Sequence, residues 1–260
     1  MAQWPLRPSN PRDRRPVRAR SWAGEKLAFW LSSLLHRRRV PGRASAAGSD
    51  RDGNSGMTTD SEAWAFQQLD RGALAAWDDA RVLALAEMAF AAAPDFYDLM
   101  PLPHAGVIDL ISKQLGAPNT ETSSLYVLSQ GDKEVALVCP LPAATLNRAK
   151  QDATLAIIRS LDRASRSKYM AALGRYTPTV EPFDSEGLYL TRLAVKASSR
   201  RSGVGAQAVQ RFIDLGAGQP CSLHVKTDNA SAIPLYEKFG FRFVSDRPFR
   251  FRAMLRQGRA

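Results

Sequence analysis

The stretch SSRRSGVG, residues 198–205, combines residue types that can hold an anion. Arg200 and Arg201 bring two positive charges, and Gly203 and Gly205 allow close approach of the backbone because they carry no Cβ. An apolar stretch precedes the segment and an amphipathic pattern follows it, which predicts a turn between a strand and a helix. Backbone N–H groups at the start of a helix are unpaired and lie at the positive end of the helix dipole. The segment is therefore predicted to bind a phosphate group.

Two other phosphate-binding motifs fit this segment less well. The dinucleotide fingerprint belongs to the first unit of a βαβ series, whereas this segment comes late in the chain and no such series follows it. The P-loop requires Lys and then Ser or Thr after its last glycine, and Ala206-Gln207 stands at that place.

A second stretch, NASAIPLYEKFGF at residues 229–241, strengthens the interpretation of the first. Together the two stretches resemble the signatures of the GNAT superfamily of N-acetyltransferases. The cofactor pattern of that family, Gln/Arg-x-x-Gly-x-Gly/Ala, is matched by Arg200, Gly203 and Gly205. Its second signature, an Asn, then Ala, Leu-Tyr and Gly-Phe, is matched within residues 229–241. The similarity covers about residues 187–244.

The resemblance implies an acetyl-CoA-dependent N-acetyltransferase that transfers the acetyl group to a small-molecule or peptide amine by direct attack. It implies that the backbone of the strand before the loop pairs with the pantetheine arm of acetyl-CoA, through Leu193, Ala194 and Val195. The pyrophosphate would lie at the loop, and the implied binding residues are Arg200, Arg201, Ser202, Gly203, Val204, Gly205 and Ala206.

The resemblance also assigns roles to two side chains. Asn229 would donate a hydrogen bond to the cofactor arm, although Asn229 as a helix cap is the alternative. Tyr236 would protonate the leaving thiolate, for which a phenol with a pKa of about 10 is suited; without the motif, an aromatic core residue would be the simpler interpretation. A backbone N–H near Val195 would stabilise the oxyanion. Pro234 favours a regular helix from about Ile233 onward.

The general base is left open by the sequence. Residues 188–195 contain no carboxylate, and the nearest acidic residues are Glu181, Asp184 and Glu186. Glu186 is the candidate base, with a solvated loop acid as the alternative for that residue and an ordered water as the alternative route. His224 is expected to pack as an ordinary strand residue.

Hydrophobic periodicity gives the elements that must position these residues. Strands are predicted at 64–69, 187–196, 221–226, 241–244 and 249–255, and a hairpin over 123–141 with its tip at Gly131-Asp132. Helices are predicted at 75–93, 104–115, 207–215 and 228–239, and two helices or one bent helix at 143–173. This order predicts a mixed α/β (α+β) fold, a single GNAT-type domain whose central mixed, mostly antiparallel sheet carries helices on both faces.

The charge distribution separates a basic segment from a near-neutral body. The chain of 260 residues has a formal charge of +11, of which +8 lies in residues 1–56. We expect residues 1–60 to be a basic, disordered extension, with a targeting segment as the alternative, and residues 61–260 to be the acetyltransferase domain. Because the body carries little net charge, the composition argues against a nucleic-acid-binding domain.

The remaining composition favours a reduced compartment. The chain has two cysteines and no Cys/His cluster at ligand spacing, so we expect a cytoplasmic protein with no metal site. No stretch reaches the length of a membrane span, and the family resemblance leaves a homodimer open. The alternative function is a GNAT-fold sensor or scaffold that binds acyl-CoA, with the basic segment contacting nucleic acid or anionic lipid.

Overall fold

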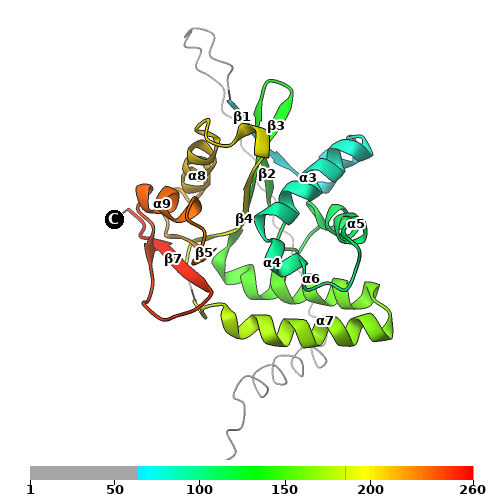
Figure 1. The fold of residues 1–260 in the computed structure, drawn as a ribbon. Coiled ribbons are helices and arrows are strands. Elements are labelled where there is room, and N and C mark those ends of the chain that lie inside the picture. Colours follow the sequence, from blue (N-terminus) through cyan, green and yellow to red (C-terminus); the bar gives the residue numbers. More distant parts are fainter. Residues whose placement is uncertain (1–63, 185, 260) are drawn as a thin grey trace, which may run out of the picture. The chain divides into compact units, whose positions relative to one another are not determined.

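The computed structural model describes residues 64–184 and 186–259, so the predicted extension at residues 1–60 lies outside the described residues. One seven-stranded sheet has the order β1-β2-β3-β4-β5-β7-β6 (Figure 1). Its strands are β1 (Trp64–Leu69), β2 (Leu125–Gln130), β3 (Lys133–Pro142), β4 (Leu188–Val195), β5 (Cys221–Lys226), β6 (Arg242–Phe243) and β7 (Phe251–Arg256). Only β4 and β5 are parallel. The predicted mixed, mostly antiparallel sheet is confirmed.

The helices fall into three groups along the chain. From residue 64 onward, four precede β2: α2 (Arg71–Ala75), α3 (Asp79–Ala92), α4 (Pro94–Tyr97) and α5 (His104–Gln114). Two connect β3 to β4: α6 (Leu146–Ser160) and α7 (Arg163–Tyr176). The last two are α8 (Val204–Leu215) after β4 and α9 (Ala232–Lys238) after β5. Short 3₁₀ turns occupy Ala143–Thr145, Thr177–Thr179 and Ala197–Ser199.

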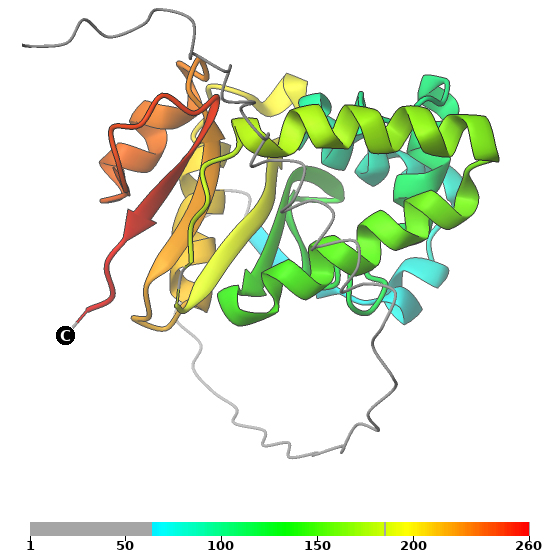
Figure 2. The same ribbon diagram turned by 90° about the horizontal axis from the view of Figure 1, so that it is seen from below.

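Alternate residues of β3 supply the two halves of the core, because successive side chains of a strand point to opposite faces. Leu137 and Cys139 pack in a cluster with side chains of α3, α5, α6 and α7. Ala136 and Val138 pack on the opposite face with α8 and α9. Helices therefore cover both faces of the sheet, and α6 and α7 lie together on the first of them (Figure 2).

Helix capping explains where the structure departs from the predicted boundaries. The carboxylate of Asp78 accepts a hydrogen bond from the backbone N–H of Arg81 at 2.8 Å, so α3 begins at Asp79 rather than at Ala75. Helix α3 ends at Ala92, two residues before Pro94, and Pro94 then opens the short helix α4. Helix α8 begins at Val204, three residues before the predicted start.

Both cysteines pack inside the sheet as free thiols. Burial raises the pKa of Cys139 to about 12, which keeps its thiol protonated. Within residues 64–184 and 186–259, no helix is both long and apolar enough to span a membrane.

Gly187 fixes the start of β4 against two other segments. Its carbonyl accepts the N–H of Ala143 at 2.9 Å, and the next N–H, that of Leu188, donates to the carbonyl of Pro220 at 2.9 Å. Gly187 has a φ of +76°, and a Cβ there would overlap the carbonyl oxygen of Pro220. Only glycine satisfies both conditions, because a side chain would be strained by the conformation and by the contact.

We predict that Gly187→Ala lowers the free energy of unfolding by more than about 3 kcal/mol, since steric overlap adds to the cost of a left-handed backbone. Gly131→Ala is the matched control, because Gly131 has a φ of +58° with open space around it. Its expected loss is about 1 kcal/mol. Urea denaturation of both variants measures the difference, and equal losses would contradict this account.

Candidate active site

Strands β4 and β5 pair over a short length and then separate. Their parallel register contains three residue pairs, from Leu188 with Cys221 to Leu190 with Leu223. Beyond these pairs β4 continues to Val195 and β5 to Lys226. The two strands are therefore unpaired toward their carboxyl ends, and the region between these unpaired segments is called the opening below.

A β-bulge marks the point where the strands separate. Cys139 of β3 pairs with Arg192, whereas the next residue, Pro140, pairs with Leu190. Thr191 is therefore an extra residue on β4 and has no Cα partner in the register with β3. An extra residue of this kind bends its strand and increases the local twist. The bend falls at the first residue of β4 after the last pair with β5, which accounts for the separation.

Alternation along β4 determines which backbone groups face the opening. The N–H of Lys196 donates to Val135 of β3 at 2.8 Å. Because backbone groups alternate in direction along a strand, Ala194 also faces β3, whereas Leu193 and Val195 face the opening. Of the three β4 residues predicted to contact a ligand, two therefore turn their backbone groups away from β3, and Ala194 directs its own toward β3. The carbonyl of Val195 accepts a hydrogen bond from Nε of Arg200 at 3.3 Å.

The turn after β4 supplies unpaired N–H groups, as the sequence predicts. Among the described residues, no backbone acceptor is found for the amides of residues 201–206, while the next amide, that of Gln207, donates to Gly203 at 3.1 Å. No side chain caps α8 at its N-terminus. These amides lie at the carboxyl end of the opening, which makes the turn an anion site by the general property of helix starts.

The two glycines of the turn have different structural reasons. Gly203 has a φ of +85° with open space where a Cβ would lie, so the left-handed conformation requires it. At Gly205 a Cβ would lie 3.2 Å from Cδ2 of Leu235, so this position allows α8 to approach α9. Gly205 thus allows close packing of α8 on α9, and its role toward a ligand stays a prediction.

The two arginines of the turn are exposed. Nε of Arg200 donates to the carbonyl of Val195 at 3.3 Å, which places its guanidinium at the end of β4. Arg201 adopts a φ of +65°, an uncommon conformation for a residue with a side chain. The charge of Arg200 therefore lies at the end of β4, next to the turn.

Asn229 lies two residues before Ser231, which is the N-cap of α9. Oδ1 of Asn229 accepts the N–H of Ala232 at 3.1 Å and the hydroxyl of Ser231 at 3.0 Å, and its role toward a cofactor stays a prediction. Its position at the carboxyl end of β5 leaves the amide nitrogen to donate elsewhere.

Tyr236 is buried in the core on the α8 side, where its ring contacts Phe241 edge-to-face at 5.8 Å. Leu190, the last residue of β4 that pairs with β5, belongs to the same cluster. Burial raises the pKa of Tyr236 to about 12, so the phenol keeps its proton at neutral pH.

A hydrogen-bonded pair that the sequence did not predict joins the two strands at the apex of the opening. The hydroxyl of Tyr189 lies 2.8 Å from Nδ1 of His224, and Nε2 of His224 lies 2.7 Å from the carbonyl of Glu181. A carbonyl only accepts, so Nε2 carries the hydrogen and the Tyr189 hydroxyl donates to Nδ1. Burial lowers the pKa of His224 to about 4, which keeps the ring neutral.

The three acidic residues before β4 lie in different surroundings. Both carboxylate oxygens of Glu181 are engaged, one by the hydroxyl of Ser245 and the other by the N–H of Ala253 at 2.8 Å. Asp184 lines a cavity beside Tyr189. Glu186 is exposed before the start of β4, five residues or about 16 Å of extended strand from Thr191. The structure does not bring Glu186 together with the other predicted site residues.

A buried ion pair between Arg192 and Glu121 lies next to the bulge at Thr191. Arg192 contacts the carboxylate of Glu121 at 3.0 Å, and the hydroxyl of Thr191 lies 2.6 Å from the carbonyl of the same residue. The Arg192 guanidinium also lies 5.3 Å from the ring centroid of Tyr97. The loop before β2 is thereby anchored to the bend in β4. No cluster of three or more potential metal ligands occurs in the part of the chain that the structure describes.

Comparisons with known proteins agree with this geometry. Residues 144–241 match the model of the acetyltransferase (GNAT) family. A solved structure described as an acetyltransferase shares 17% identity with a TM-score of 0.53 and covers 70% of this chain and 97% of its own. An N-acetyltransferase from Staphylococcus aureus Mu50 shares 18% identity with a TM-score of 0.53 and covers 68% of this chain and 95% of its own. These likenesses concern the fold, and a comparison with curated proteins finds no match.

We predict that His224 makes the fold sensitive to mild acid. The pKa in the folded state, about 4, lies below the ordinary value of 6.5, so the unfolded chain binds the proton more readily between these values. The stability that this histidine contributes is complete above pH 6.5 and is lost as the pH falls toward 4, by about 3 kcal/mol. His224→Gln retains a donor but does not titrate, so its unfolding free energy should decline less over this range. Parallel denaturation series measure both, and identical declines would contradict the assignment.

Proposed function

We propose that this chain, whose residues 144–241 match the model of the acetyltransferase (GNAT) family, is an acetyl-CoA-dependent N-acetyltransferase that transfers the acetyl group directly to an amine. One observation carries the proposal. The backbone groups of Leu193 and Val195 face an opening between two strands that leads to the unpaired amides of residues 201–206. The pantetheine arm of acetyl-CoA is an extended chain with amide groups, and it ends in a pyrophosphate. It therefore matches the strand backbone followed by the amides of the turn.

The binding residues follow from that match. Leu193 and Val195 would pair with the pantetheine arm as a neighbouring strand would. The amides of residues 201–206 would hold the pyrophosphate, with charge-assisted contacts from Arg200 and Arg201. Asn229 would donate from its amide nitrogen to the arm. Acetyl-CoA supplies an activated acetyl group and a thiolate that can leave.

The chemistry requires little of the protein beyond position and charge. The amine nitrogen forms a bond with the acetyl carbon, the carbon–sulfur bond breaks, and one N–H proton leaves to water. A β4 backbone N–H, at Val195 or beside it, would stabilise the oxyanion. Tyr236 would give its proton to the thiolate and recover one from solvent. Glu181 is committed to Ser245 and Ala253, which argues against Glu181 as the general base; Glu186 and an ordered water stay the proposed routes.

Release of free thiol from acetyl-CoA across a panel of amines tests the proposal. We expect amine-dependent release, with the acetylated amine identified by mass spectrometry. Binding of CoA without release on any amine would support the alternative, a GNAT-fold module that binds acyl-CoA, and would overturn the proposed activity.

We predict that Tyr236→Phe lowers kcat by about 10- to 100-fold with a KM for acetyl-CoA near that of the wild type, because the lost group acts only on the leaving thiolate. Tyr126→Phe is the matched control, since the Tyr126 hydroxyl bonds to Gln68 on β1, away from the opening. Steady-state kinetics of both variants measure the effect. A loss of less than about two-fold in Tyr236→Phe would remove the acid role.

A further inference from the structure

The connection between β3 and β4 is far longer than the sheet requires. These strands are antiparallel neighbours, which a turn of two residues can join. The chain instead uses residues 143–187 to build α6, α7 and a returning segment. That segment lies along β7, where the N–H of Glu181 donates to the carbonyl of Phe251 at 2.9 Å. This long connection therefore covers one face of the sheet beside β4 (Figure 2).

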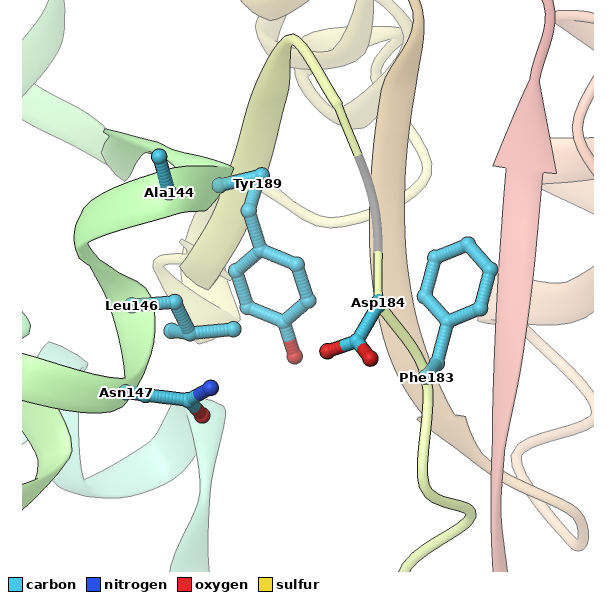
Figure 3. Close-up of a pocket in the computed structure, with 7 residues that line it drawn as sticks. Ala144, Leu146, Asn147, Phe183, Asp184 and Tyr189 are labelled. Carbon is cyan, nitrogen blue, oxygen red and sulfur yellow. The ribbon is translucent and has the colours of Figure 1, made fainter.

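A cavity of about 120 Å³ lies between the β3–β4 connection and β4 (Figure 3). The start of α6 contributes Leu146 and Asn147, the returning segment contributes Phe183 and Asp184, and β4 contributes Tyr189. The Tyr189 hydroxyl points between Asn147 and the carboxylate of Asp184 (Figure 3). The volume approaches the roughly 150 Å³ that accepts a guest the size of benzene.

Tyr189 links the cavity to the apex of the opening. It is the residue before Leu190, the last residue of β4 that pairs with β5. Its hydroxyl hydrogen is committed to His224, whose other ring nitrogen is fixed by the carbonyl of Glu181. The oxygen of Tyr189 therefore presents only lone pairs to the cavity, and a group that bonds to it must be a donor, such as an N–H.

The charge of the cavity has one sign. Asp184 is the charged residue among those that line it. Lys150 stands 5.7 Å from the ring centroid of Tyr189 and is outside the lining. A carboxylate entering the cavity would meet Asp184, whereas an ammonium group would be attracted to it.

We infer that this cavity is the acceptor site and that its acceptors are primary alkyl amines without a carboxylate on the carbon that bears the amine. The inference rests on the proposed acetyltransferase function. Tyr189 accepts a hydrogen bond from the amine, and Asp184 attracts the ammonium form before a proton is lost. The long connection between β3 and β4 then determines which amine this chain accepts.

Two acceptors that differ in one group test the inference. Pentan-1-amine and norleucine share the same carbon chain, and norleucine adds a carboxylate at the amine-bearing carbon. We expect kcat/KM from thiol release to be at least about 10-fold higher for pentan-1-amine. Asp184→Asn should reduce this ratio to below about 3-fold and raise the KM for pentan-1-amine, with the KM for acetyl-CoA unchanged. Asp132→Asn, at the tip of the β2–β3 hairpin, is the matched control and should change neither value.

A binding measurement separates this inference from the proposed activity. In NMR titrations, pentan-1-amine should shift the side-chain amide signals of Asn147 in the wild type, and Tyr189→Phe should weaken that response by several-fold. Binding without thiol release would overturn the activity and leave the site intact. Thiol release with unshifted Asn147 signals, or equal use of norleucine, would overturn the site.

Discussion

Everything at the candidate site depends on one departure from regular pairing, the separation of β4 from β5 after three residue pairs. Backbone N–H and C=O groups that lose a strand partner must be satisfied by something else. Here the loss is built into the sheet, because the bulge at Thr191 bends β4 where the pairing stops. A buried contact of Arg192 with Glu121 holds the bend. The fold thus maintains open hydrogen-bonding positions that a ligand, rather than a strand, can fill.

The elements around the separation divide the chemistry between them. Helix α8 begins at the carboxyl end of β4 and adds its unpaired amides to the same line of sites. Helix α9 brings Tyr236 to the core beneath the last pair of residues. On the other face, the long connection from β3 to β4 encloses a cavity that meets β4 at Tyr189. The separation therefore lies between a face suited to a phosphorylated ligand and a face suited to an amine.

Residue patterns along the sequence were enough to predict the elements whose conformation depends on neighbouring residues. The glycines and arginines of residues 200–205, between an apolar strand and an amphipathic helix, predicted the turn correctly. The pairing of Tyr189 with His224 was out of reach, because it depends on the parallel register between strands that are far apart in the sequence. The packing of Gly205 against Leu235 was out of reach for a similar reason, since Leu235 belongs to another helix. Glu186 was chosen by nearness in sequence to β4, which does not reveal that it precedes the distant end of that strand.

Hydrogen exchange at single residues of β4, with and without CoA, tests the central claim most directly. In the free protein the amides of Leu193 and Val195 should exchange faster than that of Ala194, which faces β3. Addition of CoA should slow exchange at Leu193, at Val195 and across residues 201–206, and should leave Ala194 nearly unchanged. Uniform exchange along β4 with no response to CoA, or protection confined to another part of the chain, would contradict the account.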